Sequence, residues 1–265
     1  SKFKSKIKKY ILSQSKKNVK IFVNNNDHFL TSLKKYSSNI KTFGSSLKSN
    51  YNYKILKLTD KKSTFHIYKD KKILTKNLST NLLGEHNVQN LTAALSTIDD
   101  LGYKIIKSHI LNFKGTKRRL NILGKIKKTI LIDDYAHHPT EIEKLINISR
   151  LYKKKHIIFI IEPHRYSRLN DLYNQYLRVL KNIKNLVIIK TYEAGENYKK
   201  GMKNSKNLVN DLNVLNNQKT RYVENYHHLF NLLDKFVLNK SESIIISAGA
   251  GDISNQIRFF YDSRK

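Results

Sequence analysis

The sequence contains no cysteine and only two prolines among its 265 residues. Without cysteine, neither a disulfide framework nor a thiolate metal site can form, and this absence fits a reducing cytoplasm. No apolar run approaches the roughly 18–20 residues that a membrane-spanning helix requires. The basic opening SKFKSKIKKY has no apolar segment of the kind found in signal peptides. We therefore expect a cytoplasmic protein that does not enter a membrane.

Acidic residues are also scarce, because 20 of them face 51 basic residues and leave a net charge of +31. Such a charge is typical of nucleic-acid-binding proteins. However, only nine of the basic residues are arginine, the side chain that reads nucleic acid through bidentate contacts. Lysine is spread through every segment together with asparagine and isoleucine, as an AT-rich genome would produce. We therefore predict no specific nucleic-acid partner.

The region 118–265 alternates apolar strand patterns with helical patterns. The predicted strands cover 129–133, 156–161, 185–191, 220–223 and 243–248. The predicted helices cover 139–152, 169–183, 203–213, 225–237 and 252–260. Strands separated by helices of about 10–15 residues indicate a parallel sheet, and continuously apolar strands indicate a sheet covered on both faces. We expect an α/β fold here: a doubly wound, mostly parallel, Rossmann-like sheet.

The region 1–117 is α/β but less regular. A strand is predicted at 19–23, a helix at 27–36, two or three antiparallel strands within 51–78, and helices at 88–100 and 104–113. Asp70-Lys71 is the predicted hairpin turn. These strands are too few for a self-sufficient sheet, and the chain begins with serine rather than methionine. We therefore expect the end of an α/β domain whose start lies outside this sequence.

Two clusters of polar residues each follow a predicted strand. The first is Asp133–Glu141 (DDYAHHPTE) and the second is Glu162–Arg168 (EPHRYSR). Because ligands bind beyond the carboxyl ends of the strands in an open parallel sheet, both clusters are predicted to face a ligand. Arg165 and Arg168 are three residues apart, so both could contact one anion at a helix N-terminus. An alternative is that these arginines pair with surface acids, and that Asp134 only satisfies amides of its own loop.

The remaining motifs are ambiguous when each is taken alone. In Gly84–Asn90 (GEHNVQN), Asn87 and Asn90 share a helix face and could contact an adenine edge, but capping of the helix is favoured. The basic loop Gly115–Arg119 could hold phosphate oxygens or be an exposed linker. Tyr192–Glu196 (YEAGE) and Ala248–Asp252 (AGAGD) follow two further strands, where tight packing accounts for the glycines equally well.

Taken in order, these motifs resemble the Mur ligase family. The family pattern reads GxHNxxN, GxxRRF, DDY[GA]HHPTE, QPHR[YF][ST]RxxDL, YxAGE and GAG[ND]I; this chain has GEHNVQN, GTKRRL, DDYAHHPTE, EPHRYSRLNDL, YEAGE and GAGDI. The resemblance implies an ATP-dependent, peptidoglycan-precursor ligase that adds L-alanine to UDP-N-acetylmuramate through an acyl phosphate. It further implies that 1–117 is the end of the central ATP-binding domain and that 118–265 is the C-terminal domain.

The resemblance also implies roles for single residues. His86, Asn87, Asn90, Arg119 and Asp134 would bind ATP. The alanine carboxylate and the new amide would be surrounded by Tyr135, His137, His164, Arg165 and Arg168. Among these, the catalytic residues would be His137, His164 and Arg165. ATP and Mg²⁺ are the implied cofactors, and no metal ligand is assigned within this chain.

The chain departs from the family pattern at three points. Glu162 stands where glutamine is usual, and Leu120 replaces an aromatic residue. No GxxGK[ST] loop is present to cradle phosphates. The P-loop, the uridine-nucleotide domain and the main Mg²⁺ ligands are therefore expected in a missing N-terminal portion, without which this chain should be inactive. The alternative is a noncatalytic, degenerate module of the same family that binds a nucleotide or an amino acid.

Overall fold

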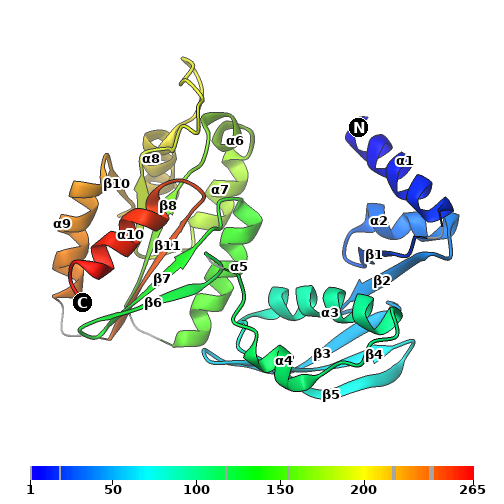
Figure 1. Ribbon diagram of the computed structural model, residues 1–265. Helices are drawn as coiled ribbons and strands as arrows, with labels where there is room; N and C mark the ends of the chain where they lie inside the picture. Colours follow the sequence, from blue (N-terminus) through cyan, green and yellow to red (C-terminus); the bar gives the residue numbers. More distant parts are fainter. Residues whose placement is uncertain (1, 18, 117, 154–155, 217–218, 239–241) are drawn as a thin grey trace. The chain divides into compact units, whose positions relative to one another are not determined.

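The computed structural model describes residues 2–17, 19–116, 118–153, 156–216, 219–238 and 242–265. The chain divides into two compact units, Ser1–Lys114 and Gly115–Lys265. Figure 1 shows that each unit is built around its own sheet. Lys117, which belongs to the predicted basic loop, lies outside the described residues. Among those residues, no helix is both long enough and apolar enough to cross a membrane.

The first unit contains a five-stranded sheet in the order β1-β2-β3-β4-β5. Its strands are β1 (Ile21–Asn24), β2 (Ile40–Gly44), β3 (Tyr51–Leu58), β4 (Ser63–Lys69) and β5 (Lys72–Thr80). The pairs among β1, β2 and β3 are parallel, while β3, β4 and β5 are antiparallel. The expectation that this region has too few strands for its own sheet was therefore wrong. Strand β2 was missed because its alternating pattern is only five residues long and polar loops flank it.

The helices of the first unit cover this sheet. They are α1 (Lys2–Lys16), α2 (His28–Ser32) with a 3₁₀ turn at Leu33–Tyr36, α3 (Glu85–Asp100) and α4 (Lys107–Asn112). Residues of α3 such as Val88 and Leu95 pack with Tyr53 and Phe65 of the sheet in one apolar cluster. The predicted hairpin turn is present, and Asp70 and Lys71 both have positive φ angles, of 44° and 67°. That pair of angles is typical of the turns that suit the twist of antiparallel strands.

The second unit is the predicted doubly wound domain, with six strands in the order β10-β9-β8-β11-β7-β6. Its strands are β6 (Asn121–Ile126), β7 (Thr129–Asp134), β8 (His156–Glu162), β9 (Leu186–Ile189), β10 (Arg221–Val223) and β11 (Ser243–Gly249). Five of the strands are parallel, and β6 is an antiparallel edge strand that was not predicted from the sequence. The inner strands β8, β9 and β11 are buried along most of their lengths, as continuously apolar runs require.

Helices lie on both faces of this second sheet (Figure 1). They are α5 (Pro139–Ser149), α6 (Tyr166–Asp171), α7 (Tyr173–Leu180), α8 (Ser205–Asn216), α9 (Tyr226–Val237) and α10 (Ile253–Asp262). On one face, Leu229 and Leu233 of α9 and Ile257 of α10 join the strands in the main apolar cluster. This parallel arrangement brings the carboxyl ends of β7, β8 and β11 to one edge of the sheet.

Candidate active site

The carboxyl end of β7 holds two buried carboxylates that make hydrogen bonds and an ion pair within the second unit. Asp134 is 8% exposed, and its two oxygens accept the backbone N–H groups of Leu120 and Ala136, both at 2.7 Å. Burial raises the pKa of Asp134 in spite of these hydrogen bonds. Asp133 is fully buried, where it accepts from the Ser254 hydroxyl at 2.6 Å and pairs with Arg258 at 3.2 Å. In this structure Asp134 therefore accepts backbone N–H groups of its own region, as the alternative interpretation expected.

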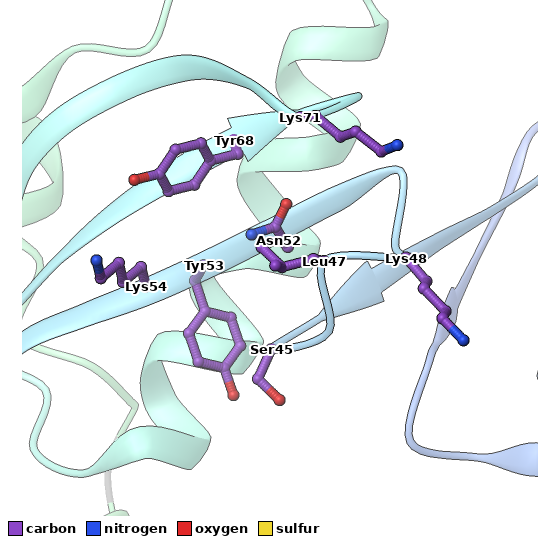
Figure 2. Close-up of a pocket in the computed structure, with 8 residues that line it drawn as sticks. All are labelled: Ser45, Leu47, Lys48, Asn52, Tyr53, Lys54, Tyr68 and Lys71. Carbon is purple, nitrogen blue, oxygen red and sulfur yellow. The ribbon is translucent and has the colours of Figure 1, made fainter.

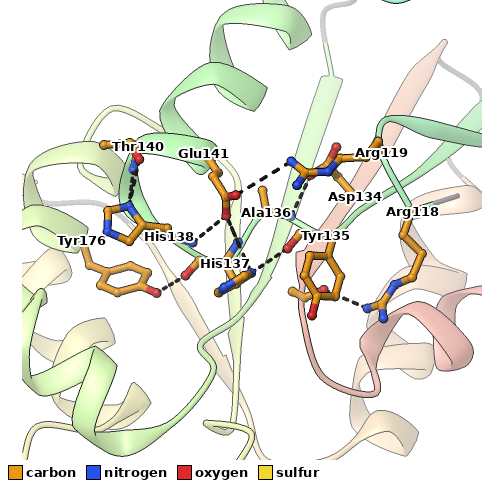
Figure 3. A network of polar contacts seen from close by, with 11 residues as sticks. Arg118, Arg119, Asp134, Tyr135, Ala136, His137, His138, Thr140, Glu141 and Tyr176 are labelled. Atoms are coloured by element: carbon orange, nitrogen blue, oxygen red, sulfur yellow. Dashed lines mark hydrogen bonds and ion pairs between the residues drawn. The ribbon is translucent and has the colours of Figure 1, made fainter. Parts of the chain in front are cut away.

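The adjacent histidines His137 and His138 have different environments (Figure 3). His138 caps the N-terminus of α5, where its ring Nδ1 lies 3.3 Å from the amide nitrogen of Thr140. His137 Nδ1 lies 2.9 Å from the Tyr135 carbonyl oxygen. Because a carbonyl oxygen only accepts, His137 donates from Nδ1, which leaves its Nε2 available to a ligand. Of the two histidines, His137 is the one presented to the cluster at the strand ends.

Glu141 joins the first cluster to the basic loop. Its Oε2 accepts the backbone N–H groups of His137 and His138 at 3.2 Å, and its Oε1 lies 3.8 Å from Arg119 Nη1 (Figure 3). These amides, together with the charge of His137 when protonated and of Arg119, lower the pKa of Glu141 although burial opposes the shift. Glu141 thus holds the backbone of the two histidines and pairs loosely with the exposed Arg119 side chain.

The carboxyl end of β8 presents the second cluster. Arg165 adopts a positive φ of 69° at the start of α6, and its backbone N–H donates to the Tyr192 carbonyl oxygen at 2.8 Å. Such a left-handed conformation costs free energy in a non-glycine residue and is concentrated at functional sites. The Arg165 guanidinium is half-exposed and lies 3.9 Å from Glu196, which also accepts from the Ser167 hydroxyl. The turn therefore directs Arg165 and the following residues to the strand-end edge.

A row of rings connects the two clusters. Ring centroids are 5.2 Å apart for Tyr135 and His137, 5.7 Å for His137 and His164, and 5.4 Å for His164 and Tyr192. The last pair is stacked, with an interplanar angle of 26°. The structure thus brings together Tyr135, His137 and His164, although His164 is well separated in sequence from the other two. Tyr192 completes the row, and its motif was noted in the sequence without a role for this residue.

Polar atoms in this region are buried without a partner among the described residues. They include His164 Nδ1, Arg168 Nη1 and Arg118 Nε. Burial is the main cause of a lowered pKa for His164, and the charges of Arg168, His137 and Arg165 add to it. Buried donors without partners are costly in a folded protein. Asp133 Oδ1, an acceptor at the end of β7, also lacks a partner in the described part of the chain. A ligand with both acceptor and donor groups would complement these atoms.

Arg118 contributes to the same edge, although the sequence motif pointed to its neighbour Arg119. Its Nη2 donates to the carbonyl oxygens of Gly249 and Gly251 at 3.0 and 3.3 Å, and its guanidinium carbon lies 4.6 Å from the Tyr135 ring centroid. A Cβ at Gly251 would come within 2.3 Å of Glu162 Oε2 and 2.5 Å of Tyr192 Cγ. The glycines of this loop are therefore required by close packing around the site.

Glu162 is 2% exposed, and its carboxylate accepts from the Tyr226 hydroxyl and from the Ile253 amide. Burial raises the pKa of Glu162 in spite of these hydrogen bonds. The folded chain therefore binds this proton more tightly than the unfolded chain does. Consequently, the contribution of Glu162 to stability is present below the unfolded pKa and is lost as the pH rises through the folded pKa.

We predict that Glu162→Gln stabilises the chain at about pH 8 relative to the parent and changes it little at about pH 4. The amide keeps the side-chain size and removes the charge that burial disfavours. Urea unfolding of both proteins at the two pH values measures the difference. Glu143→Gln, at an exposed position of α5, is the matched control and should show no such pH-dependent gain. An equal effect of Glu162→Gln at both pH values would show that the buried charge is not the cause.

The predicted ATP residues are divided between the two units. His86, Asn87 and Asn90 lie in the first turns of α3, where Asn87 Nδ2 donates to the Leu83 carbonyl oxygen at 2.8 Å. This hydrogen bond is donated to a carbonyl oxygen, so it does not cap a free N–H of α3, whose N-cap position is Gly84. The capping role favoured from the sequence is therefore not what this Asn87 contact provides. Arg119 and Asp134 lie in the second unit. Within the described residues, no group of three His, Asp or Glu side chains is placed to hold a metal ion.

Comparison with known proteins places both units in one family. Residues 118–251 match the model of the Mur ligase glutamate ligase domain, and residues 5–98 match the Mur ligase middle domain. Two similar curated proteins are the UDP-N-acetylmuramate–L-alanine ligases of Pelagibacter ubique and Wigglesworthia glossinidia brevipalpis. The Pelagibacter protein is 34% identical over 88% of this chain and 51% of its own length. The Wigglesworthia protein is 35% identical over 82% of this chain and 47% of its own length.

The solved structures agree on the fold. The crystal structure of UDP-N-acetylmuramate–alanine ligase from Thermotoga maritima superposes with a TM-score of 0.73 and 24% identity, over 93% of this chain and 52% of that one. The chain thus spans about half the length of the relatives that it matches. With matches to two successive family domains, and with a site at the expected strand ends, the chain belongs to the Mur ligase family.

Proposed function

We propose that this chain is the nucleotide- and amino-acid-binding half of an ATP-dependent ligase in peptidoglycan precursor synthesis. The complete enzyme would add L-alanine to UDP-N-acetylmuramate in the cytoplasm. The similar curated proteins, which are UDP-N-acetylmuramate–L-alanine ligases, support this choice of substrates. In this proposal, 1–117 is the end of the central ATP-binding domain and 118–265 is the C-terminal domain. The rest of the enzyme would supply the remaining nucleotide contacts.

The observation that carries the proposal is the set of arginine and histidine side chains that follows β8, in which Arg165 pairs with Glu196 while Arg168 and His164 each keep a buried nitrogen atom without a described partner. Arg168 Nη1 and His164 Nδ1 are buried without hydrogen-bond partners among the described residues, and the half-exposed Arg165 starts the same helix. A guanidinium presents two parallel N–H groups that match the two oxygens of a carboxylate. The cluster is therefore suited to the carboxylate of an incoming amino acid.

Each residue of the cluster then has a part in positioning the alanine. Arg168 and Arg165 would hold its carboxylate, and His164, whose pKa is lowered mainly by burial, would lie beside them. His137, which donates from Nδ1 to a backbone carbonyl, would accept from the alanine amine at Nε2. Tyr135 would pack beside this histidine. The amine would thus be held with its lone pair free for attack.

The reaction that this positioning serves is acyl transfer. The amine nitrogen attacks the acyl-phosphate carbon, a tetrahedral intermediate forms, and its collapse releases phosphate and leaves the amide. The proton leaves the amine to solvent or to the departing phosphate, so no obligatory general base is required. Arginine side chains near the intermediate would stabilise its negative charge. We assign the catalytic roles to His137, His164 and Arg165 on this basis.

For ATP, we propose contacts from His86, Asn87, Asn90, Arg119 and Asp134. Asn87 and Asp134 already make intramolecular hydrogen bonds, but each retains oxygen lone pairs for a ligand. Mg²⁺ would supply charge neutralisation at the phosphates when bound. Mg²⁺ is commonly held by one or two carboxylates together with nucleotide phosphates, and the described residues offer no cluster of three His, Asp or Glu side chains for it. The ligands of the ion would belong to the rest of the enzyme.

The proposal is tested by phosphate release from the complete ligase that contains this chain. Release should require ATP, UDP-N-acetylmuramate and L-alanine together, because the acyl phosphate forms on one substrate and is consumed by the other. Omission of each component in turn is the control. A folded complete protein that releases no phosphate with all three present would overturn the assignment.

A further inference from the structure

A pocket of about 900 Å³ lies on the first unit. We call it the Asn52 pocket. Its lining residues are Ser45, Leu47, Lys48, Asn52, Tyr53, Lys54, Tyr68 and Lys71 (Figure 2). Its size falls within the range of about 300–1,000 Å³ that is usual for small-molecule sites. The pocket is formed by β3, β4 and the loops that precede and follow them.

Asn52 and Tyr68 line the pocket from the face of the sheet opposite α3. Tyr53 packs in the apolar cluster with Val88 and Leu95 of α3. Because successive side chains of a strand point to opposite faces, Asn52 and Lys54 project from the other face. Tyr68 is the direct cross-strand partner of Asn52 and shares that face. A ligand that contacts Asn52 and Tyr68 would therefore be separated by the sheet from Asn87 and Asn90.

Asn52 is the observation that points to a ligand. The residue is 1% exposed, and neither its Oδ1 nor its Nδ2 has a hydrogen-bond partner among the described residues. Burial of a carboxamide without partners is unfavourable. Its donor and acceptor lie side by side, so they complement a ligand edge that also presents one donor and one acceptor. Leu47 of the preceding loop also lines the pocket (Figure 2) and is 73% exposed.

The other lining residues favour a ligand that carries a negative charge and a flat ring. Lys48, Lys54 and Lys71 line the pocket, no acidic residue does so, and none of the three lysines pairs with a described acid. These ammonium groups favour an anion such as phosphate. Tyr68 offers a ring on the same face as Asn52, and nucleic-acid bases stack on such rings.

We propose that the Asn52 pocket binds a nucleotide. The base edge would exchange two hydrogen bonds with the Asn52 carboxamide while the ring packs against Tyr68, and the phosphate would lie among the three lysines. This combination distinguishes a nucleotide from a free phosphate, which would leave Asn52 unpaired. The site is separate from the one in the proposed function and does not depend on that function.

Titration of the ¹⁵N-labelled 265-residue chain with uridine monophosphate and adenosine monophosphate tests this site. At least one nucleotide should shift the amide signals of residues around Asn52 in a saturable manner. Inorganic phosphate should bind at least roughly tenfold more weakly, because it makes no contact with the carboxamide. Equal binding of phosphate and nucleotide would overturn recognition of the base.

Variants separate a binding role for Asn52 from a structural one. Asn52→Leu should weaken nucleotide binding roughly tenfold or more and should leave the melting temperature unchanged or higher, because it removes polar atoms that have no partner. Lys54→Ala should weaken binding, whereas Lys57→Ala, at an exposed position further along β3, should not. Unchanged binding by Asn52→Leu, no saturable shift with either nucleotide, or shifts confined to the start of α3 would each overturn the proposal.

Discussion

Replacement of Arg168 with alanine is expected to lower kcat/KM for L-alanine by about 10- to 100-fold in the complete ligase. A hydrogen bond to a charged group is worth about 1.5–3 kcal/mol, and each interval of about 1.4 kcal/mol corresponds to a factor of ten. Arg168 Nη1 is buried without a partner among the described residues, so its contact is available to the amino-acid carboxylate. Steady-state phosphate release at varied L-alanine concentration measures the loss.

Two further variants make this prediction specific. Arg168→Lys keeps the charge but loses the paired N–H geometry, so it should fall between the parent and Arg168→Ala. Arg178→Ala, at an exposed position of α7, should leave the L-alanine kinetics unchanged. The apparent affinity for ATP should be unaltered in all three. If Arg168→Ala retained the parental kinetics for L-alanine, the proposed site for the amino acid would be wrong.

Replacement of Arg258 with leucine is expected to destabilise the chain by about 2–3 kcal/mol. The change removes the ion-pair partner of Asp133, a carboxylate that is fully buried at the end of β7. Loss of one partner of a buried pair leaves an uncompensated charge, which costs about 3–5 kcal/mol when both groups are buried. Because Arg258 is 39% exposed, we expect a smaller value. Urea denaturation of the isolated chain measures the free energy of unfolding.

The double variant Asp133→Asn/Arg258→Leu tests the cause of this loss. It removes both charges and keeps a side chain that can still accept from Ser254. We therefore expect it to be more stable than Arg258→Leu alone, since no buried charge remains. If the double variant is no more stable than Arg258→Leu, the loss of stability comes from lost packing of the arginine side chain and not from the buried charge.

The strands of the second unit could be predicted from sequence because most are buried on both faces. Runs such as Ile157–Ile161 are apolar at every position, and in a region with regularly spaced helices this pattern is typical of strands in a covered parallel sheet. The edge strand β6 escaped prediction because it is covered on only part of its length and contains Gly124. The lysine-rich helix α1 was also not predicted, although Ile7, Tyr10 and Ile11 recur at helical spacing.

The position of the candidate site could also be predicted from the sequence, but the contacts of each side chain could not. Strand ends located both clusters, since parallel strands bring their carboxyl ends to one edge. Sequence could not decide which of His137 and His138 faces the cluster, because the answer depends on capping of α5. The contribution of Tyr192 depends on its stacking on His164. Such contacts between distant segments leave no local sequence signal.

The most direct test of the proposed amino-acid site is a histidine-selective ¹H–¹³C NMR titration of this chain with L-alanine. We expect saturable shifts of the His137 and His164 ring signals, with a rise in the pKa of His164 as the bound carboxylate offsets the nearby arginine charges. His227 and His228, which lie on α9, should not respond. Saturable binding that leaves His137 and His164 unchanged, or no binding of L-alanine at all, would contradict the proposed site.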